Sequence, residues 1–537
     1  MWPSRRPLRP LLCDNARMHR RIPLALILSF AACNDDGSPS GADARPPHDG
    51  FADTGGSTDA RLDLPALDLP ATDLAPGDLA GSDGKGPDKG SVDLGGCPAV
   101  TPKPAADPWT VRAPGQSFGG LLTQTKGGHT DVFLKSQTDY IRIGARLDWG
   151  GTVVFFGLSA NPGSNVIDAN DTGRELQLAL YDPTRAMQGC AHDASCQSGG
   201  TACPTSITYL GWNPVQGGDE CGHGGKVLSH GKHGEGLRLS VQPVQWNPDW
   251  DKPTCVKSPC PSAGIPVQVT YTFDLRFLTE HVVEVASQVT SQETMSHPST
   301  GQEFPTLYVA HSSPDLPLLL DAAGKTIALT TPGNDGFYFG NFTSPAPWVT
   351  WQDSAKTYGV GLAMDQGITS WQGWRGDGST APYFHNVRAQ IAFGLGAGKT
   401  VRGLSYLALG SFATVKAELT AALAKRPPFG VVDAPGLDVK LQPGQALTVT
   451  GWVLDSAKVG TVDVAIDGKK AATLTVNKAR PDVCAVYPAY DGCPDVGFSG
   501  TVPTSGLGPC PHLIRVSATD KDGNTTVLGE SRLRVGP

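Results

Sequence analysis

The chain has 537 residues, enough for three or four domains. Hydrophobic residues make up only 39% and charged residues 18%, while 66 Gly and 45 Pro favour strands and turns over a helical bundle or a coiled coil. The formal net charge is −8 and no basic tract lies beyond the N-terminus, which argues against a nucleic-acid partner. No run of 18 apolar residues is present, which excludes a multi-span membrane protein.

The N-terminal region has the pattern of an export signal. After Met18, basic residues at 19–21 precede an apolar segment at 22–32 that is too short to span a bilayer. The Ser-Phe-Ala-Ala sequence before Cys33 resembles a bacterial lipobox, with Phe30 where Leu is usual. The resemblance implies lipidation of Cys33 and a location at the outer membrane or cell surface. The alternative is ordinary cleavage before Cys33, which yields a soluble secreted protein.

Residues 34–96 predict a disordered tether. They contain 13 Asp, no Glu and 4 Lys or Arg, and from Asp63 to Asp93 an Asp recurs at every fifth position. A period of five matches neither a helix nor a strand, and like charges keep such a chain extended. The alternative is calcium binding by the Asp series, but the fixed ligand spacing of repeat calcium sites is missing.

Ten cysteines follow Cys33, and an even number in an exported chain predicts disulfides. Six lie within 190–260 and three within 484–510, which leaves Cys97 to complete the second group or to fix the start of the fold. Zinc is the rival interpretation, but no C-x2-C pair occurs.

The segment 117–412 is dominated by strand periodicity. Apolar residues alternate with polar ones over 267–277 and 387–395, and a second strand with apolar positions at 283, 285 and 289 follows the first. Long antiparallel strands with one credible helix, near 414–425, predict a large β-sandwich over 97–428.

Residues 429–537 predict a separate small β-sandwich of seven strands with turns at Asp-Gly. The stretches Gly-Trp-Val-Leu-Asp at 451–455, Val-Ala-Ile-Asp-Gly at 464–468 and Ala-Thr-Asp-Lys-Asp-Gly-Asn at 518–524 resemble those of bacterial immunoglobulin-like modules. These stretches are structural and indicate no ligand.

No nucleophile elbow, zinc-protease motif, Walker loop or dinucleotide fingerprint occurs, so no cofactor is expected. Two polar clusters are candidate sites instead. The first contains Asp171, Arg174, Glu175 and Gln177, and its alternative is an internal Asp–Arg bridge that fixes a loop. The second contains Gln216 and Asp219 around a Gly-Gly pair, with a disulfide-braced turn as its alternative.

Three further groups stand out. Histidines 223, 230 and 233 suit a metal site less well than an exposed glycine-rich loop. Glu303 is a candidate acid or base, although His311 would lie too far along an unbroken strand to pair with it. The aromatic group suits stacking against sugar rings, with ordinary core filling as the alternative, and consists of Trp348, Trp351, Trp371, Trp374, Tyr383 and His385.

In length, in all-β pattern and in polar clusters at strand starts, residues 117–425 resemble the galactose-mutarotase-like supersandwich family. The resemblance implies a carbohydrate ligand in a concave groove lined by charged and aromatic side chains. No family residue can be matched to a position here.

We therefore expect an exported lipoprotein whose large β domain binds a poly- or oligosaccharide, with epimerase, lyase or hydrolase chemistry left open. As an enzyme it would use Glu303 or Asp219 as base and Arg174 to anchor the substrate. The alternative is a non-catalytic surface binding or adhesion protein that contacts the membrane only through its lipid.

Overall fold

The computed structural model describes residues 96–182, 212–246, 262–311, 313–332, 337–376 and 384–536. Cys33, the Asp-rich segment, Tyr383 and five of the ten cysteines lie outside these ranges. The described chain is nearly all β, as predicted, with four sheets and two short α-helices. Within it, no helix is long and apolar enough to cross a membrane.

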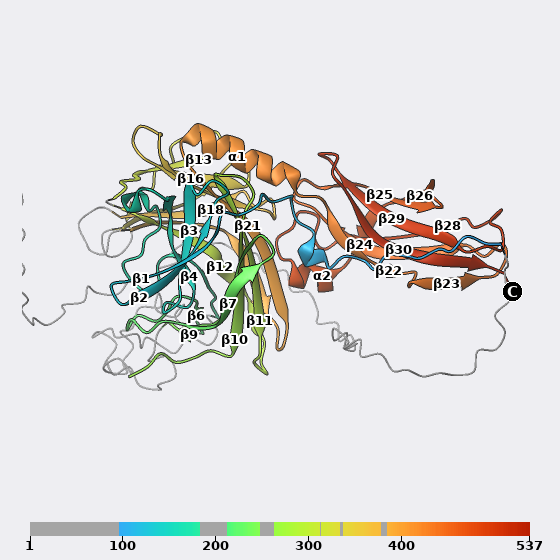
Figure 1. Ribbon diagram of the computed structural model, residues 1–537, viewed down its shortest axis with the longest axis horizontal. Helices are drawn as coiled ribbons and strands as arrows, with labels where there is room; N and C mark the ends of the chain where they lie inside the picture. Colours follow the sequence, from blue (N-terminus) through green and yellow to red (C-terminus); the bar gives the residue numbers. More distant parts are fainter. Residues whose placement is uncertain are drawn as a thin grey trace, which may run out of the picture. The chain divides into compact units, whose positions relative to one another are not determined.

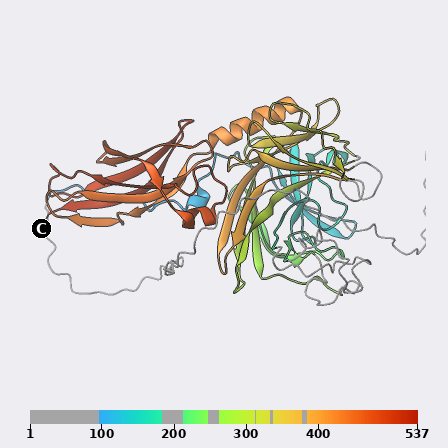
Figure 2. The same ribbon diagram turned by 180° about the vertical axis from the view of Figure 1, so that it is seen from behind.

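The large domain contains two antiparallel sheets (Figures 1 and 2). The side chains on their facing sides form one core. Sheet 1 has the order β1-β2-β3-β4-β5-β12-β19-β18-β15-β14, with β20 paired to β12, β6 to β5, and β9 to β6. Its strands are β1 (Gly120–Lys126), β2 (His129–Lys135), β3 (Ile141–Arg146), β4 (Thr152–Leu158), β5 (Leu176–Ala179), β6 (Pro214–Val215), β9 (Val244–Gln245), β12 (His297–Ala310), β14 (Thr331–Pro332), β15 (Phe337–Thr343), β18 (Ser370–Gly376), β19 (Phe384–Ala389) and β20 (Ile391–Leu395).

Sheet 2 covers the apolar face of sheet 1 and has the order β13-β16-β17-β21-β11-β10-β8-β7. Its strands are β7 (Lys226–His233), β8 (Gly236–Gln242), β10 (Val269–Phe277), β11 (Val282–Ser291), β13 (Leu318–Asp321), β16 (Trp348–Gln352), β17 (Gly359–Met364) and β21 (Thr400–Leu409).

The strongest alternation in the sequence forms the centre of sheet 2. In β10 the side chains of Val269, Tyr271, Phe273, Leu275 and Phe277 are all buried in the core, and β11 pairs with this strand over its whole length. Burial of one face of each strand fixes their register, because a slip of one residue would expose every apolar side chain.

The run 387–395 divides into two strands rather than one. Both β19 and β20 pair with β12, on either side of a break at Gln390. The alternation continues through the break, since Val387, Ala389, Ile391 and Phe393 are all buried.

Helix α1 (Phe412–Lys425) covers part of sheet 2, close to where the sequence predicts it. Ser411 caps its N-terminus through a hydrogen bond from the backbone N–H of Thr414. Val415 and Leu419 lie on its buried stripe, and Leu419 would clash with a side chain at Gly361 of β17. The helix therefore packs directly on the backbone of sheet 2.

The C-terminal module is a second sandwich, with nine strands rather than the seven expected, in sheets of four and five. Its own core lies between the two sheets. Sheet 3 has the order β22 (Phe429–Ala434), β24 (Leu447–Leu454), β28 (Gly497–Val502), β27 (Val476–Lys478). Sheet 4 has the order β23 (Asp438–Leu441), β30 (Thr525–Val535), β29 (His512–Asp520), β25 (Val459–Ile466), β26 (Lys469–Leu474), and helix α2 (Pro481–Val486) follows β27.

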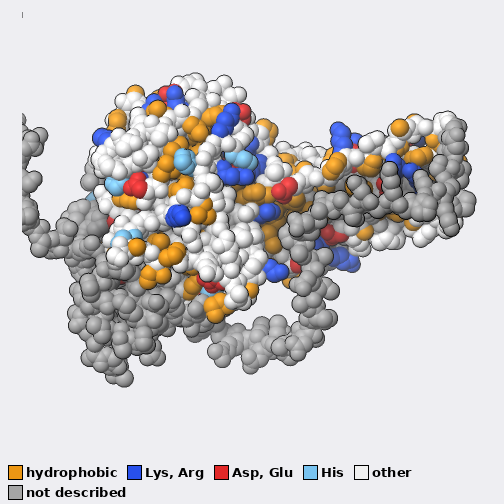
Figure 3. Space-filling model, turned by 60° about the horizontal axis from the view of Figure 1, so that its bottom comes forward, with side chains coloured by type: hydrophobic (Ala, Val, Ile, Leu, Met, Phe, Trp, Pro, Cys, Tyr) orange, Lys and Arg blue, Asp and Glu red, His pale blue; other side chains and the backbone are white. Residues whose placement is uncertain are grey.

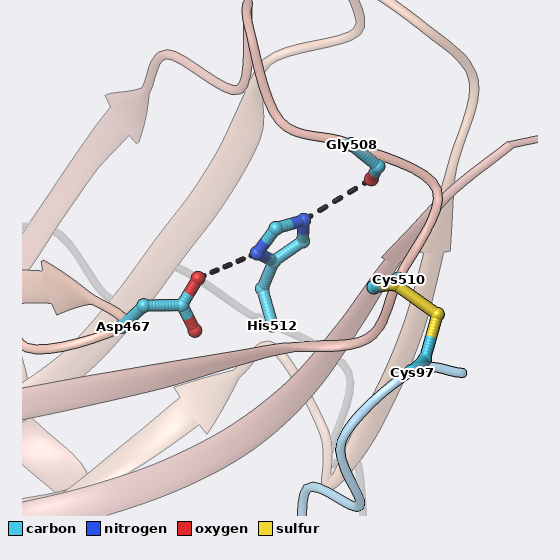
Figure 4. The surroundings of a disulfide bond; sticks show 5 residues. All are labelled: Cys97, Asp467, Gly508, Cys510 and His512. Carbon is cyan, nitrogen blue, oxygen red and sulfur yellow. Dashed lines mark hydrogen bonds and ion pairs between the residues drawn. A yellow bond between two sulfur atoms is a disulfide. The ribbon is translucent and has the colours of Figure 1, made fainter.

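Two disulfides of this module have both partners among the described residues. Cys484 pairs with Cys493, and Cys97 pairs with Cys510, so Cys97 completes the second cysteine group (Figure 4). The first residues of the described chain are thereby joined to the C-terminal module rather than to the large sandwich. Cys221 is also disulfide-bonded.

Candidate functional site

The two faces of sheet 1 differ in chemistry. One face packs into the core, and the opposite face, here called the outer face, carries the alternate side chains of the same strands. A row of polar residues crosses five neighbouring strands on this face as direct cross-strand partners: Gln177, Thr306, Arg388, Gln372 and Asn341. Polar residues on neighbouring strands are therefore held in register by the backbone ladder.

A chain of hydrogen bonds runs along this row from a buried carboxylate. Oε1 of Glu303 accepts from the hydroxyl of Tyr181 and from Nη1 of Arg388, both at 2.8 Å. Arg388 also donates through Nε to Gln372 (2.9 Å), which in turn donates to the exposed Asn341 (3.1 Å). Burial, and then the charge of Glu303, raises the pKa of Tyr181 well above its usual value, so this phenol stays protonated.

A β-bulge in β12 determines which way Glu303 points. The pairing of β12 with β5 shifts between Glu303 and Thr306. Side chains therefore do not alternate regularly from Glu303 to His311, as an unbroken strand would require. Glu303 bonds Arg388 on the outer face, whereas the ring of His311 lies 4.7 Å from that of His385. These residues therefore form no acid–base pair.

The next row of the outer face is aromatic and amide-rich. Tyr308, Asn386, Trp374 and Phe339 are cross-strand partners, and the rings of Trp374 and Phe339 stack at 4.8 Å. Oδ1 of Asn386 is buried without a hydrogen-bond partner in the described structure. An acceptor in this situation is available to a donor from a ligand or a water.

The predicted acidic loop lies on the outer face at the N-terminal end of β5. Arg174 donates to Asp171 at 2.6 Å, which is the bridge considered as an alternative, and its guanidinium also lies 5.2 Å from the ring centroid of Phe384. Asp168 and Glu175 are 1% and 0% exposed. Burial, and then the charge of neighbouring acids, raises the pKa of both carboxyl groups well above the usual range.

The second predicted cluster has the geometry of a braced turn. Oδ1 of Asp219 accepts from the backbone N–H groups of Cys221 and His223, both at 2.9 Å, and Oδ2 bonds the His223 ring at 2.8 Å. Gln216 bonds backbone groups of Leu178 and Gly150. The side chains of Asp219 and Gln216 thus hold loops together, in agreement with the alternative interpretation.

Gln177 also bonds backbone, through a donor bond to Gly173 and an acceptor bond from Gly217. It therefore ties the acidic loop to the Gly-Gly turn at the edge of the outer face.

Three of the predicted tryptophans are not on the outer face. Trp351 and Trp371 are 0% exposed in the core between the sheets, and Trp348 is buried on the other side of sheet 2, against α1. His385 stacks on Trp351 with ring centroids 4.7 Å apart, and burial lowers its pKa to about 3. These four positions are typical of core filling, and of the described members of the aromatic group only Trp374 lies with the polar rows.

Sequence reasoning missed Tyr181, Arg388, Gln372 and Asn386 as members of the site. A signal for Arg388 was present, because it occupies a polar position in the alternating run over 387–395. Nothing in the sequence indicated that Arg388 and Glu303 would lie on adjacent strands.

The histidine group does not converge. His223 bonds Asp219, whereas Nδ1 of His233 on β7 lies 3.7 Å from Asp274 on β10, with β8 between these two strands. Among the described residues, no three His, Cys, Asp or Glu side chains are arranged to hold a metal ion. On the face in Figure 3, the coloured acidic and basic side chains are interspersed rather than gathered by sign.

No protein-family model and no curated protein matches the sequence. Similar solved structures include the Slr1438 protein from Synechocystis sp. (11% identity, TM-score 0.29), which matches 56% of this chain and 99% of that protein. A putative aldose 1-epimerase from Klebsiella pneumoniae has 11% identity and a TM-score of 0.30, over 57% of this chain and 87% of that one. A 4-alpha-glucanotransferase from Thermococcus litoralis has 8% identity and a TM-score of 0.29, over 54% of this chain and 39% of that one. At such TM-scores these similarities establish neither a family nor a function.

Proposed function

We propose that this protein is an exported lipoprotein, anchored through Cys33, whose large β domain binds carbohydrate on the outer face of sheet 1. The observation that carries the binding proposal is the row of hydrogen-bonded polar side chains from Glu303 through Arg388 and Gln372 to Asn341. Its amides, guanidinium and carboxylate present both donors and acceptors, which is what neutral sugar hydroxyls require.

The aromatic row beside it supports the same proposal. Tryptophan offers a large apolar ring face, and a few well-placed polar groups next to aromatic side chains are typical of small-molecule sites. Trp374 and Phe339 stack one row away from Arg388 and Gln372, so aromatic and polar side chains lie side by side on this face, with Trp374 7% exposed.

The geometry favours binding over catalysis. A general base needs a carboxylate within reach of the ligand, yet Asp219 uses both oxygens inside its own turn and Glu303 is engaged by Tyr181 and Arg388. In an enzyme, the carboxylate of Glu303 and the phenol of Tyr181 would be the candidate acid–base pair. A non-catalytic carbohydrate-binding protein is therefore the favoured function, and an enzyme that acts on the same face is the second candidate.

The test is a glycan array probed with the purified full chain, followed by titration calorimetry of each bound glycan. Arg388→Gln should weaken binding at least tenfold, because it removes the fork that holds Glu303 and Gln372 in place. Arg142→Gln is the matched control, since Arg142 pairs with Asp139 in the turn between β2 and β3.

An array with no bound glycan would overturn the proposal, as would equal binding by the two variants. Reducing ends and unsaturated products should be measured on the same samples. Product formation that Glu303→Gln abolishes would establish an enzyme, and its absence with retained binding would establish a binding protein.

A further inference from the structure

Two tryptophans of the large domain are partly exposed, and each lies beneath an arginine that an aspartate holds. The Arg146 guanidinium carbon lies 4.4 Å from the ring centroid of Trp149. Arg146 also donates to both carboxylate oxygens of Asp131, at 2.9 and 3.2 Å. We call this group unit A.

The second group, unit B, repeats the arrangement with residues from another part of the chain. The Arg174 guanidinium carbon lies 5.6 Å from the ring centroid of Trp246, and Arg174 donates to Asp171 at 2.6 Å. A Cβ atom at Gly173 would lie 2.0 Å from the indole, so the ring of Trp246 packs directly on the backbone of residue 173. The arginine side chains of both units are 15% exposed.

Both units belong to the outer face of sheet 1, on either side of Glu175. Arg146 ends β3 and Glu175 precedes β5, with β4 between them, so they are about 10 Å apart across the sheet. The charges of Arg146 and Arg174 both act on Glu175. The two units are therefore close neighbours on one surface.

Glycine contacts fix the loops that carry the units. A Cβ atom at Gly224 would lie 1.8 Å from the carbonyl oxygen of Asp148, and one at Gly217 would lie 2.3 Å from that of Thr172. The loop at 216–225 thus packs against the chain next to Trp149 and against the chain next to Arg174. The chain segments that carry Trp149 and Arg174 therefore both pack on this one loop.

We propose that units A and B are adjacent carbohydrate-stacking subsites, which bind successive sugar rings of one oligosaccharide chain. The proposal rests on the proposed function and specifies its ligand as a chain rather than a single sugar. It places stacking at Trp149 and Trp246, neither of which belongs to the aromatic group singled out in the sequence.

The chemistry of each unit matches a pyranose ring. Each indole is partly exposed, and its exposed part can contact the C–H groups of the sugar. The partly exposed carboxylates, 18% for Asp131 and 28% for Asp171, can accept hydrogen bonds from hydroxyl groups. The stacked guanidinium restricts the rotamers of the indole before the ligand arrives, which lowers the entropic cost of binding. Two such neighbouring units select a ligand that reaches both.

The test is calorimetric titration of the full chain with mono-, di-, tetra- and hexasaccharides of glucose, mannose, xylose, N-acetylglucosamine and uronic acid. For the sugar that binds, affinity should rise at least tenfold from the monosaccharide to the hexasaccharide. Trp149→Ala and Trp246→Ala should each lower hexasaccharide affinity at least tenfold, because each loses one ring contact. Gly173→Ala should lower it through displacement of Trp246.

Tyr140→Ala is the matched control, since Tyr140 is 52% exposed at the opposite end of β3 from unit A. Unchanged circular dichroism and melting temperature would show that the variants fold. Hexasaccharide binding that survives both tryptophan changes but is lost in Arg388→Gln would overturn the two subsites and leave the proposed function intact. Failure of every sugar in the series to bind the wild type would overturn both proposals.

Discussion

Replacement of Asp455 by Asn should remove a pH-dependent loss of stability from the C-terminal module. Asp455 follows β24 and is 3% exposed. Its Oδ1 accepts from the backbone N–H of Ala457 at 2.7 Å, and its Oδ2 has no hydrogen-bond partner in the described structure. Burial, and then the charges of Asp365 and Asp520, raises the pKa of Asp455 from 3.8 to about 7.

The magnitude follows from the difference in proton binding between the folded and unfolded states. Between pH 4 and 7 the folded protein keeps this carboxyl group protonated while the unfolded chain ionises it, so the free energy of unfolding falls as pH rises. The decrease in the free energy of unfolding caused by this group is complete above the folded-state pKa. It amounts to about 4 kcal/mol at pH 8, compared with less than about 1 kcal/mol at pH 4.

The assay is urea unfolding of the wild type and of Asp455→Asn at pH 4, 6 and 8. The variant should gain stability relative to the wild type as pH rises, by about 3–4 kcal/mol between pH 4 and 8. A constant cost of burying the new amide affects each pH equally and cancels. Asp491→Asn is the control substitution, at an exposed position of the same module where Asp491 pairs with Lys458. A stability difference between wild type and Asp455→Asn that stays constant with pH would refute the reasoning.

Three further outcomes are expected. Trp351→Ala should destabilise the large domain by about 3–5 kcal/mol in urea unfolding, because it empties a core site, while glycan affinity per folded molecule stays unchanged. Removal of the Cys97–Cys510 disulfide by paired Ser substitutions should cost about 4–6 kcal/mol in the chain-entropy account, since it closes a loop of 413 residues, and should appear as a lower urea midpoint under non-reducing conditions. Cys33→Ser should move the exported protein from the membrane fraction to the soluble fraction, and retention in the membrane would contradict lipid anchoring.

Much of the architecture was predictable because strand periodicity is a local property. The alternation over 267–277 specified β10 and its buried face, and the hairpin at Asp467 and Gly468 has the positive φ angles of its predicted turn. The count of strands in the C-terminal module was less accessible, since β26 and β27 are short and mostly exposed.

The candidate site was only partly predictable. The acidic residues before β5 were identified, and the structure places Arg174 and Glu303 on the same outer face. The prediction for the aromatic group was misleading, because paired tryptophans in strand-rich sequence give the same pattern whether they face a core or a ligand. Trp351 and Trp371 occupy the positions of their strands whose side chains enter the core, and which positions these are depends on how the two sheets pack.

The sequence by itself determined which side chains alternate along each strand, and hence the two-layer architecture and the dry faces that form its core. Only the tertiary structure decided that Glu303 meets Arg388, because that contact depends on the pairing of β12 with β19 and on the bulge that turns Glu303 outward. Periodicity relates a residue to its neighbours two positions away, whereas contacts across a sheet depend on strand order, which the whole core selects.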